Sequence, residues 1–462
     1  MPGSLRRAEP RRSARSRVVV LSIVAIVLAT ALVSFAAEYF NSPSTPTGSA
    51  TPTASATGPT STPAPGDPTG TPAATAEPTS EPTPTVGAYP TPDFSKNLSS
   101  PDDFFGPLPV VSSPKVAEHY PVRALYVAGG ANMTNNLALI KSSEDLNTVV
   151  VDLKESDGIY YRSTNATALS IGAVRGGVDI KSLVATCHAA DIRVIGRIVV
   201  FKDPILAKAR PDLCLRDQSG NMLLFSNEGG LAFVSPYRQE VWDYNIAIAK
   251  EVIALGVDEV QFDYVRFPTG GTKSGAAIYV GPTGMYPTRV ETINRFLAKA
   301  KIEITDRLGV PLGADLFGII LSSRTDGKNL GQDWATVGIV PGVDNVCPMI
   351  YPSHYANNSA THYSGNGTGT YLNGILFKKP DLEPYAVMYN ALLLGKVSTE
   401  QTGYSAVRPY LQSFTASFLP SGYFMNYGAE EVAAQIKAIT DAGYTEWVCW
   451  NSRAQFPAGA FK

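Results

Sequence analysis

The feature that most constrains the fold is an alternation of short β-like and helical segments that runs from residue 122 almost to the end of the chain. Parallel strands joined by helices produce this alternation. We therefore predict an α/β fold, a (β/α)8 TIM-type barrel with enlarged loops. A doubly wound open sheet is the alternative, but no Gly-rich phosphate loop follows the first strand. The expected strands cover about eight segments, namely 122–129, 147–156, 193–201, 257–268, 311–319, 343–355, 407–415 and 446–451.

The expected helices fall between these strands. One begins at Ser235 and Pro236, a capping residue followed by proline at the first helical position. In that helix Trp242, Ile246 and Ala249 recur at helical spacing, which predicts the face that packs on the barrel. The other helices are expected at 135–146, 179–191, 288–308, near 333, from about 380, and at 430–442.

The segment 257–268, VDEVQFDYVRFP, carries carboxylates that a purely structural strand does not need. Its residues alternate between an apolar set that faces the helices and a polar set that faces the centre of a closed sheet. Chemistry in such barrels occurs at the carboxyl ends of the strands. The apolar set is Val260, Phe262 and Tyr264, and the polar set is Glu259, Gln261 and Asp263.

Two other strands repeat this pattern. In 147–156 the parity directs Asp152 and Lys154 inward, with Glu155 at the rim. In 311–319 it directs Asp315 inward. Three strands therefore bring carboxylates to the same end of one sheet. Burying an ionised carboxylate costs free energy unless the group is paired, reaches solvent in a cleft or takes part in function.

The motifs also carry a resemblance. FDYVRFP, with VVDLKESDG upstream and MIYPSHY downstream, resembles the glycoside hydrolase-like family DUF4015 over about residues 122–451. The resemblance implies a TIM-type barrel and sugar chemistry. Asp263 matches a motif position of the family, but the resemblance does not assign its role.

Glycoside hydrolysis needs two carboxyl groups, one donating a proton and the other attacking the sugar or activating water. From the residues we predict Asp263 as nucleophile or base, kept ionised by nearby Arg266. Asp315 is the predicted acid, with Glu155 as its substitute. Adjacent strands lie ~4.8 Å apart, which favours the retaining geometry. The competing interpretation is that Arg266, Arg197 or Lys154 merely pairs with these carboxylates.

Sugar-binding side chains are expected around this pair, because tyrosine and tryptophan offer a flat apolar face with a polar handle. The scattered histidines show no metal-ligand spacing, and we expect neither a metal nor a cofactor. The predicted substrate-binding residues are Asp152, Lys154, Arg197, Tyr264, Arg266, Tyr351, His354, Trp450 and Asn451.

The amino-terminal quarter has a different composition. Residues 1–17 contain six arginines and are expected to form a basic cytoplasmic tail. Residues 18–37 are uncharged and long enough for a transmembrane signal-anchor helix. A cleaved signal peptide, giving a secreted protein, is the alternative. Residues 38–114, rich in Pro, Thr and Ser, predict a disordered linker, and 115–462 the barrel.

These features predict a single-pass cell-membrane protein whose extracytoplasmic glycoside hydrolase cleaves a cell-surface or environmental polysaccharide. A non-catalytic carbohydrate-binding barrel and a structural envelope protein are the alternatives. The net charge of about −2 excludes a nucleic-acid surface. The four cysteines lie far apart and are expected to be small buried hydrophobes, although export would permit a disulfide.

Overall fold

Eight parallel strands close on one another to form the centre of the molecule. The computed structural model describes residues 100–130, 132–217, 219–270, 287–339 and 342–462, and six positions between 89 and 98. The barrel closes because β1 pairs with both β2 and β15, in parallel. In chain order its strands are β1 (Arg123–Val127), β2 (Thr148–Glu155), β5 (Arg193–Val199), β8 (Glu259–Asp263), β9 (Leu312–Phe317), β10 (Asn345–Ile350), β14 (Tyr410–Gln412) and β15 (Trp447–Trp450).

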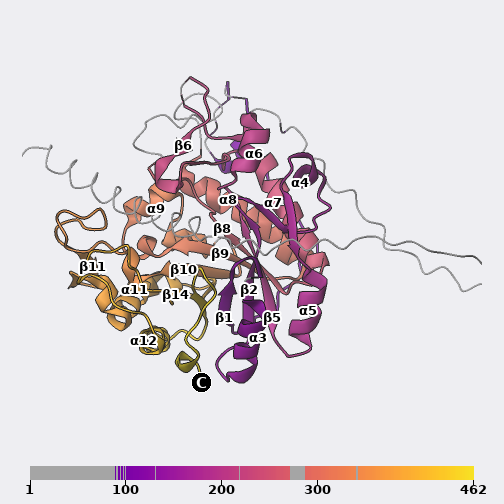
Figure 1. Cartoon of the computed structure of the whole chain (residues 1–462). Helices are drawn as coiled ribbons and strands as arrows, with labels where there is room; N and C mark the ends of the chain where they lie inside the picture. Colours follow the sequence, from indigo (N-terminus) through magenta and orange to yellow (C-terminus); the bar gives the residue numbers. More distant parts are fainter. Residues whose placement is uncertain are drawn as a thin grey trace, which may run out of the picture.

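Helices surround these strands on all sides (Figure 1). The predicted (β/α)8 barrel is confirmed, and each of the eight expected strands contains an observed one. The helices of the described residues are α2 (Pro101–Phe105), α3 (Met133–Ser142), α4 (Ala166–Ser170), α5 (Ile180–His188), α6 (Pro204–Ala209), α7 (Gln239–Ala254), α8 (Arg289–Lys301), α9 (Arg324–Leu330), α10 (Trp334–Val337), α11 (Pro384–Thr399) and α12 (Ala429–Asp441).

Short strands decorate the loops, as expected for a barrel with long insertions. Strand β3 pairs with β2 in an antiparallel hairpin, and β4 extends this edge. Two further hairpins, β6–β7 and β11–β12, stand apart from the barrel sheet. These accessory strands are β3 (Gly158–Tyr161), β4 (Val174–Val178), β6 (Leu224–Phe225), β7 (Leu231–Ala232), β11 (Thr370–Leu372), β12 (Ile375–Phe377) and β13 (Ala406–Val407).

The helix expected at Ser235 and Pro236 was placed too early. Helix α7 begins at Gln239, after a turn in which Ser235 O accepts from Arg238 N at 3.1 Å. Its predicted packing face is confirmed, because Trp242 and Ala249 are fully buried. The capping residue therefore closes a turn that precedes the helix.

Helix α8 begins as a capping residue predicts, at Arg289. Thr288 accepts from Glu291 N, and the Glu291 side chain returns a bond to Thr288 N. Phe296 of this helix stacks on Phe262 of β8, with ring centroids 5.5 Å apart. The apolar face of β8 thus packs outward against a helix, which leaves its polar face to the barrel interior.

The end of the predicted linker contains ordered structure. Within the stretch 38–114, residues Pro101–Phe105 form α2, capped by Ser100. Phe105 packs against Trp242, with ring centroids 4.6 Å apart. Phe105 supplies apolar surface that the Pro- and Thr-rich part of the linker lacks. Contacts with the barrel therefore begin before residue 115.

The basic tail, the membrane segment and most of the linker lie outside the described residues. In the part of the chain that the structure covers, no helix is both long and apolar enough to cross a membrane. All four cysteines are buried and free, as their spacing predicted.

Candidate active site

Four adjacent barrel strands bring charged side chains together inside the barrel, towards their carboxyl ends. Strand β2 supplies Asp152 and Glu155, β5 supplies Arg197, β8 supplies Asp263 and β9 supplies Asp315. Period-two alternation directs the aspartates inward as predicted. We call these five residues the Arg197 cluster.

The guanidinium of Arg197 contacts all four carboxylates of the cluster. Its Nη1 donates to Asp152 Oδ1 at 2.5 Å and to Glu155 Oε1 at 2.6 Å. Its Nη2 and Nε donate to Asp263 Oδ2 at 2.5 and 3.1 Å. Asp315 Oδ2 lies 3.7 Å from Nε. One buried cation therefore binds carboxylates from three different strands.

The carboxyl groups of the cluster have divergent acidities. Burial raises the pKa of Asp315 well above its ordinary value, and the negative charge of Asp263 adds to this shift. Burial also raises the pKa of Asp152, to about 7, against the opposing attraction of Arg197. For Glu155 the attraction and hydrogen bond of Arg197 outweigh burial and lower the pKa. Carboxyl pairs with divergent pKa values are typical of acid–base sites.

The cluster has an inner and an outer level. Asp152 and Asp315 are 0% and 1% exposed, whereas Asp263 is 6% exposed and Glu155 is partly exposed. Asp315 Oδ1 is buried and has no hydrogen-bond partner within the described structure. Since Asp263 Oδ2 and Asp315 Oδ2 lie 3.1 and 3.7 Å from the same Nε, they are less than about 7 Å apart, an upper bound that is compatible with the closer glycosidase pairs of ~5–5.5 Å.

Aromatic side chains fill the opposite half of the barrel interior. The Trp450 ring lies 5.6 Å from Tyr126, 5.7 Å from Tyr351 and 5.3 Å from Phe414, measured between centroids. Trp450 and Val448 belong to the inner apolar cluster, so Trp450 does not pack on the outer helices. The carboxylates thus face an aromatic wall across the barrel.

The predicted rim residues of the later strands have mixed environments. His354 contacts the ring of Tyr351 at 5.3 Å, and burial lowers its pKa to about 4, which keeps the imidazole neutral. Asn451 donates to Ser413 O, an interaction that holds the loop after β15. His354 therefore lies beside the aromatic wall, whereas the Asn451 amide is occupied by the backbone.

Lys154 does not point into the barrel, so this expectation was wrong. The pairing of β2 with β5 shifts register between Asp152 and Lys154, which sets Lys154 opposite Ile198. Its Nζ lies 2.9 Å from Asp203 and 5.6 Å from the ring centre of Tyr244, on α7. Because of this register shift, the side chains of the last residues of β2 point to the opposite face of the sheet from the one that strict alternation predicts.

Arg266 makes its direct contacts elsewhere than with Asp263, although the charges of the two side chains attract each other at a distance and help to raise the pKa of Arg266. Its Nη1 donates to Glu228 Oε1 at 2.8 Å, in the loop before β7. Tyr264 adopts a left-handed φ of 51°, which ends the alternation of β8. Its ring lies under Arg266 and Lys202, at 4.8 and 4.7 Å. The cation that holds Asp263 is Arg197.

Sequence reasoning missed three side chains near the site. Lys202 follows β5, and its attraction helps to lower the pKa of Glu155. Its position beyond the predicted strand 193–201 was a usable signal. Tyr126 donates to Asp152 from β1, where strand parity could have identified it. Glu228 lies in an irregular loop, and no pattern in the sequence marks it.

Comparison with known proteins gives one family and several loosely similar structures. The family model described as "Putative glycosyl hydrolase domain" (DUF4015) matches residues 122–456. No curated protein matches the chain.

Among solved structures, a hypothetical protein from Ruminiclostridium thermocellum ATCC 27405 is 34% identical, covers 41% of this chain and 96% of its own, and has a TM-score of 0.37. The PgaB (BpsB) glycoside hydrolase domain from Bordetella bronchiseptica is 11% identical, with 72% and 95% covered and a TM-score of 0.48. The α-galactosidase TtGalA from Thermus thermophilus is 12% identical, with 74% and 60% covered and a TM-score of 0.45. At these scores the likenesses add nothing to the fold that strand pairing establishes.

Proposed function

We propose that this chain, which belongs to the DUF4015 family of glycosyl hydrolase domains, hydrolyses glycosidic bonds with the paired carboxylates of the Arg197 cluster. One observation carries the proposal: four carboxylates, three of which have pKa values shifted in different directions, converge on one guanidinium near the carboxyl ends of the barrel strands. In this fold the carboxyl ends of the strands are where catalysis takes place. An aromatic wall facing the carboxylates supports a sugar as the substrate.

Asp263 is the proposed nucleophile or base. Arg197 donates two N–H groups to the Asp263 carboxylate. The backbone N–H of the next residue, Tyr264, also donates to this carboxylate, at 2.5 Å. These donors hold the carboxylate in place for attack on the sugar or for activation of water. Its outer position in the cluster is consistent with contact to a sugar.

Asp315 is the proposed acid. A raised pKa keeps its proton available at neutral pH, as a general acid needs. Glu155 is more exposed, but its lowered pKa suits a base better than an acid. Asp263 and Asp315 lie on the adjacent strands β8 and β9 with oxygens less than about 7 Å apart, which is compatible with a retaining reaction, whose pair lies ~5–5.5 Å apart.

The proposed substrate is a cell-surface or environmental polysaccharide. The basic segment 1–17 and the apolar segment 18–37 support a single-pass membrane protein with its barrel outside the cell. The Pro- and Thr-rich linker would let the barrel reach a polymer away from the bilayer. Cleavage of the apolar segment would give a secreted enzyme with the same site.

A non-catalytic carbohydrate-binding barrel is the second candidate, and one observation favours it. Asp315 is only 1% exposed, whereas a general acid must come within hydrogen-bond reach of the leaving oxygen. If no motion brings Asp315 to the sugar, the aromatic wall could still bind a glycan without cleaving it.

The test uses the purified full-length protein and a panel of bacterial envelope and storage polysaccharides. New reducing ends and glycan binding are measured in the same samples. The hydrolase predicts reducing ends from at least one glycan. Binding without any release would favour the carbohydrate-binding barrel, and neither binding nor release would contradict both.

A further inference from the structure

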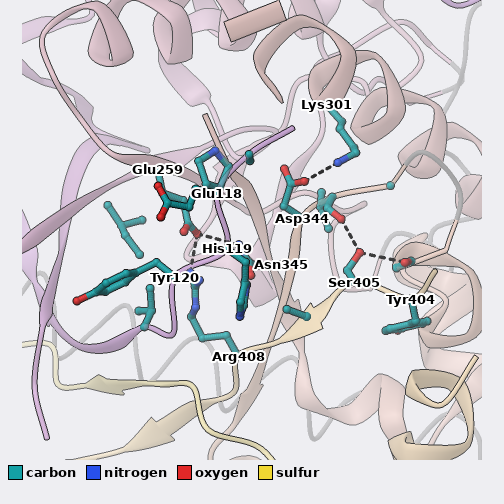
Figure 2. A pocket seen from close by; sticks show the side chains of 18 of the residues that line it. Glu118, His119, Tyr120, Glu259, Lys301, Asp344, Asn345, Tyr404, Ser405 and Arg408 are labelled. Atoms are coloured by element: carbon teal, nitrogen blue, oxygen red, sulfur yellow. Dashed lines mark hydrogen bonds and ion pairs between the residues drawn. The ribbon is translucent and has the colours of Figure 1, made fainter. Parts of the chain in front are cut away.

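A polar cavity lies at the opposite end of the barrel from the Arg197 cluster. It has a volume of about 330 Å³ and is lined by the amino-terminal ends of β5, β8 and β10, by the loop before β13 and by residues that precede β1. None of the five residues of the Arg197 cluster lines it. Figure 2 shows side chains from these separate elements converging on it. Its volume is at the lower end of the range for small-ligand pockets.

The charges that line this cavity are largely paired with one another or with their neighbours. Arg408 Nη1 donates to Glu259 Oε1 at 2.5 Å, and both side chains are at least 93% buried. Lys301 Nζ lies 2.5 Å from Asp344 Oδ1 (Figure 2). Carboxylates and cations thus alternate around the space. A ligand with a net charge of either sign would meet like charges, so a neutral ligand fits best.

Two lining groups lack hydrogen-bond partners. Asn345 is 3% exposed, and its Oδ1 is buried without a donor among the described residues. Its Nδ2 makes only a long contact of 3.4 Å to Glu259. The guanidinium of Arg193 lies 4.4 Å from the ring centre of Tyr120, with no hydrogen bond or ion pair in the described part of the chain. The cavity therefore presents a buried acceptor that needs a donor, and the donors of a partly exposed guanidinium.

We propose that this cavity is a binding site for a neutral, polyhydroxylated molecule of monosaccharide size. A hydroxyl group donates and accepts at once, so separate hydroxyls of one molecule can bond Asn345 Oδ1 and the Arg193 guanidinium. The site is independent of the Arg197 cluster and stands whether or not the chain is a hydrolase.

The experiment measures binding of glucose, galactose and N-acetylglucosamine to the full-length protein by calorimetry and ligand-observed NMR. Glucuronate and glucosamine serve as charged counterparts. We expect at least one neutral sugar to bind with a Kd of about 10 mM or below, and its charged counterparts to bind at least about tenfold more weakly.

Two variants locate the bound sugar. Asn345→Leu keeps the size of the side chain and should weaken binding about tenfold, the equivalent of one or two hydrogen bonds. Arg193→Met keeps the packing on Tyr120 while removing the guanidinium, so it tests the site even if Asn345→Leu does not fold.

Three results would overturn the inference. The first is no binding of any of the three neutral sugars to the wild type. The second is binding that neither Asn345→Leu nor Arg193→Met weakens, which would place the sugar outside this cavity. The third is binding of glucuronate or glucosamine as tight as that of the neutral sugars.

Discussion

Replacing Arg197 by methionine should destabilise the protein in a pH-dependent way. The side chain is 7% exposed and is hydrogen-bonded or ion-paired to Asp152, Glu155, Asp263 and Asp315. Methionine fills a similar volume but leaves these carboxylates without their shared cation. Removing one partner of a buried ion pair costs about 3–5 kcal/mol, and we expect a loss in this range at pH 7.5.

The sign of the pH dependence follows from the proton balance. Without the cation, the folded-state pKa values of the four carboxyl groups rise above their unfolded values of about 4. The folded variant then binds more protons than its unfolded state, so its stability falls as pH increases above about 4. The difference from the wild type should be largest at neutral pH and should shrink towards pH 4.

Urea unfolding, followed by tryptophan fluorescence at pH 7.5 and 4.5, measures this effect. Arg408→Met is the matched control, because Arg408 is 1% exposed and its ion pairs within the described part of the chain are with Glu259 and Glu446, at the other end of the barrel. Arg408→Met should also lower the free energy of unfolding. Its effect should depend less on pH, because it leaves two carboxylates, and not four, without their cation. An Arg197→Met protein as stable as the wild type at pH 7.5 would refute the cluster as described.

Three further changes test particular contacts. Asp315→Asn should lower kcat/KM by about 10²–10⁴-fold and remove the alkaline limb of the pH–rate profile. The reason is that an acid with a raised pKa acts until the pH exceeds that pKa. An unchanged profile would exclude Asp315 as the acid. Lys154→Met should lower the free energy of unfolding by about 3 kcal/mol, because the ion pair with Asp203 is lost, and should leave KM unchanged. A rise in KM with unchanged stability would instead indicate that Lys154 contacts the substrate. Gly318→Ala should cost about 1–3 kcal/mol in thermal unfolding, because its Cβ would lie 2.5 Å from Met349 O, and a neutral effect would contradict this packing.

The barrel was predictable because its physical signals are local. Each expected strand contains an observed one, since apolar runs and turn residues mark strands without long-range information. The same period placed Asp152, Asp263 and Asp315 inside the barrel. Strand neighbours then follow from the closed topology, so the convergence of these carboxylates was available from the sequence.

The errors fall where the alternation breaks or where a partner is distant in sequence. A register shift after Asp152 reversed Lys154, and nothing in VVDLKES marks it. Arg266 pairs with Glu228, which a loop brings back over the barrel from 38 positions away. The arginine closer in sequence to Asp263 was therefore chosen over Arg197, 66 positions away, which strand pairing places beside it.

The central claim is that Asp263 takes part in breaking a glycosidic bond. The most direct measurement compares kcat/KM of the full-length wild type and Asp263→Asn on the polysaccharide that the wild type cleaves best, with binding of the same glycan measured in parallel. The account predicts a loss of about 1000-fold or more, equivalent to ~4 kcal/mol of transition-state stabilisation, with glycan binding retained. A variant that turns over within tenfold of the wild type would contradict it.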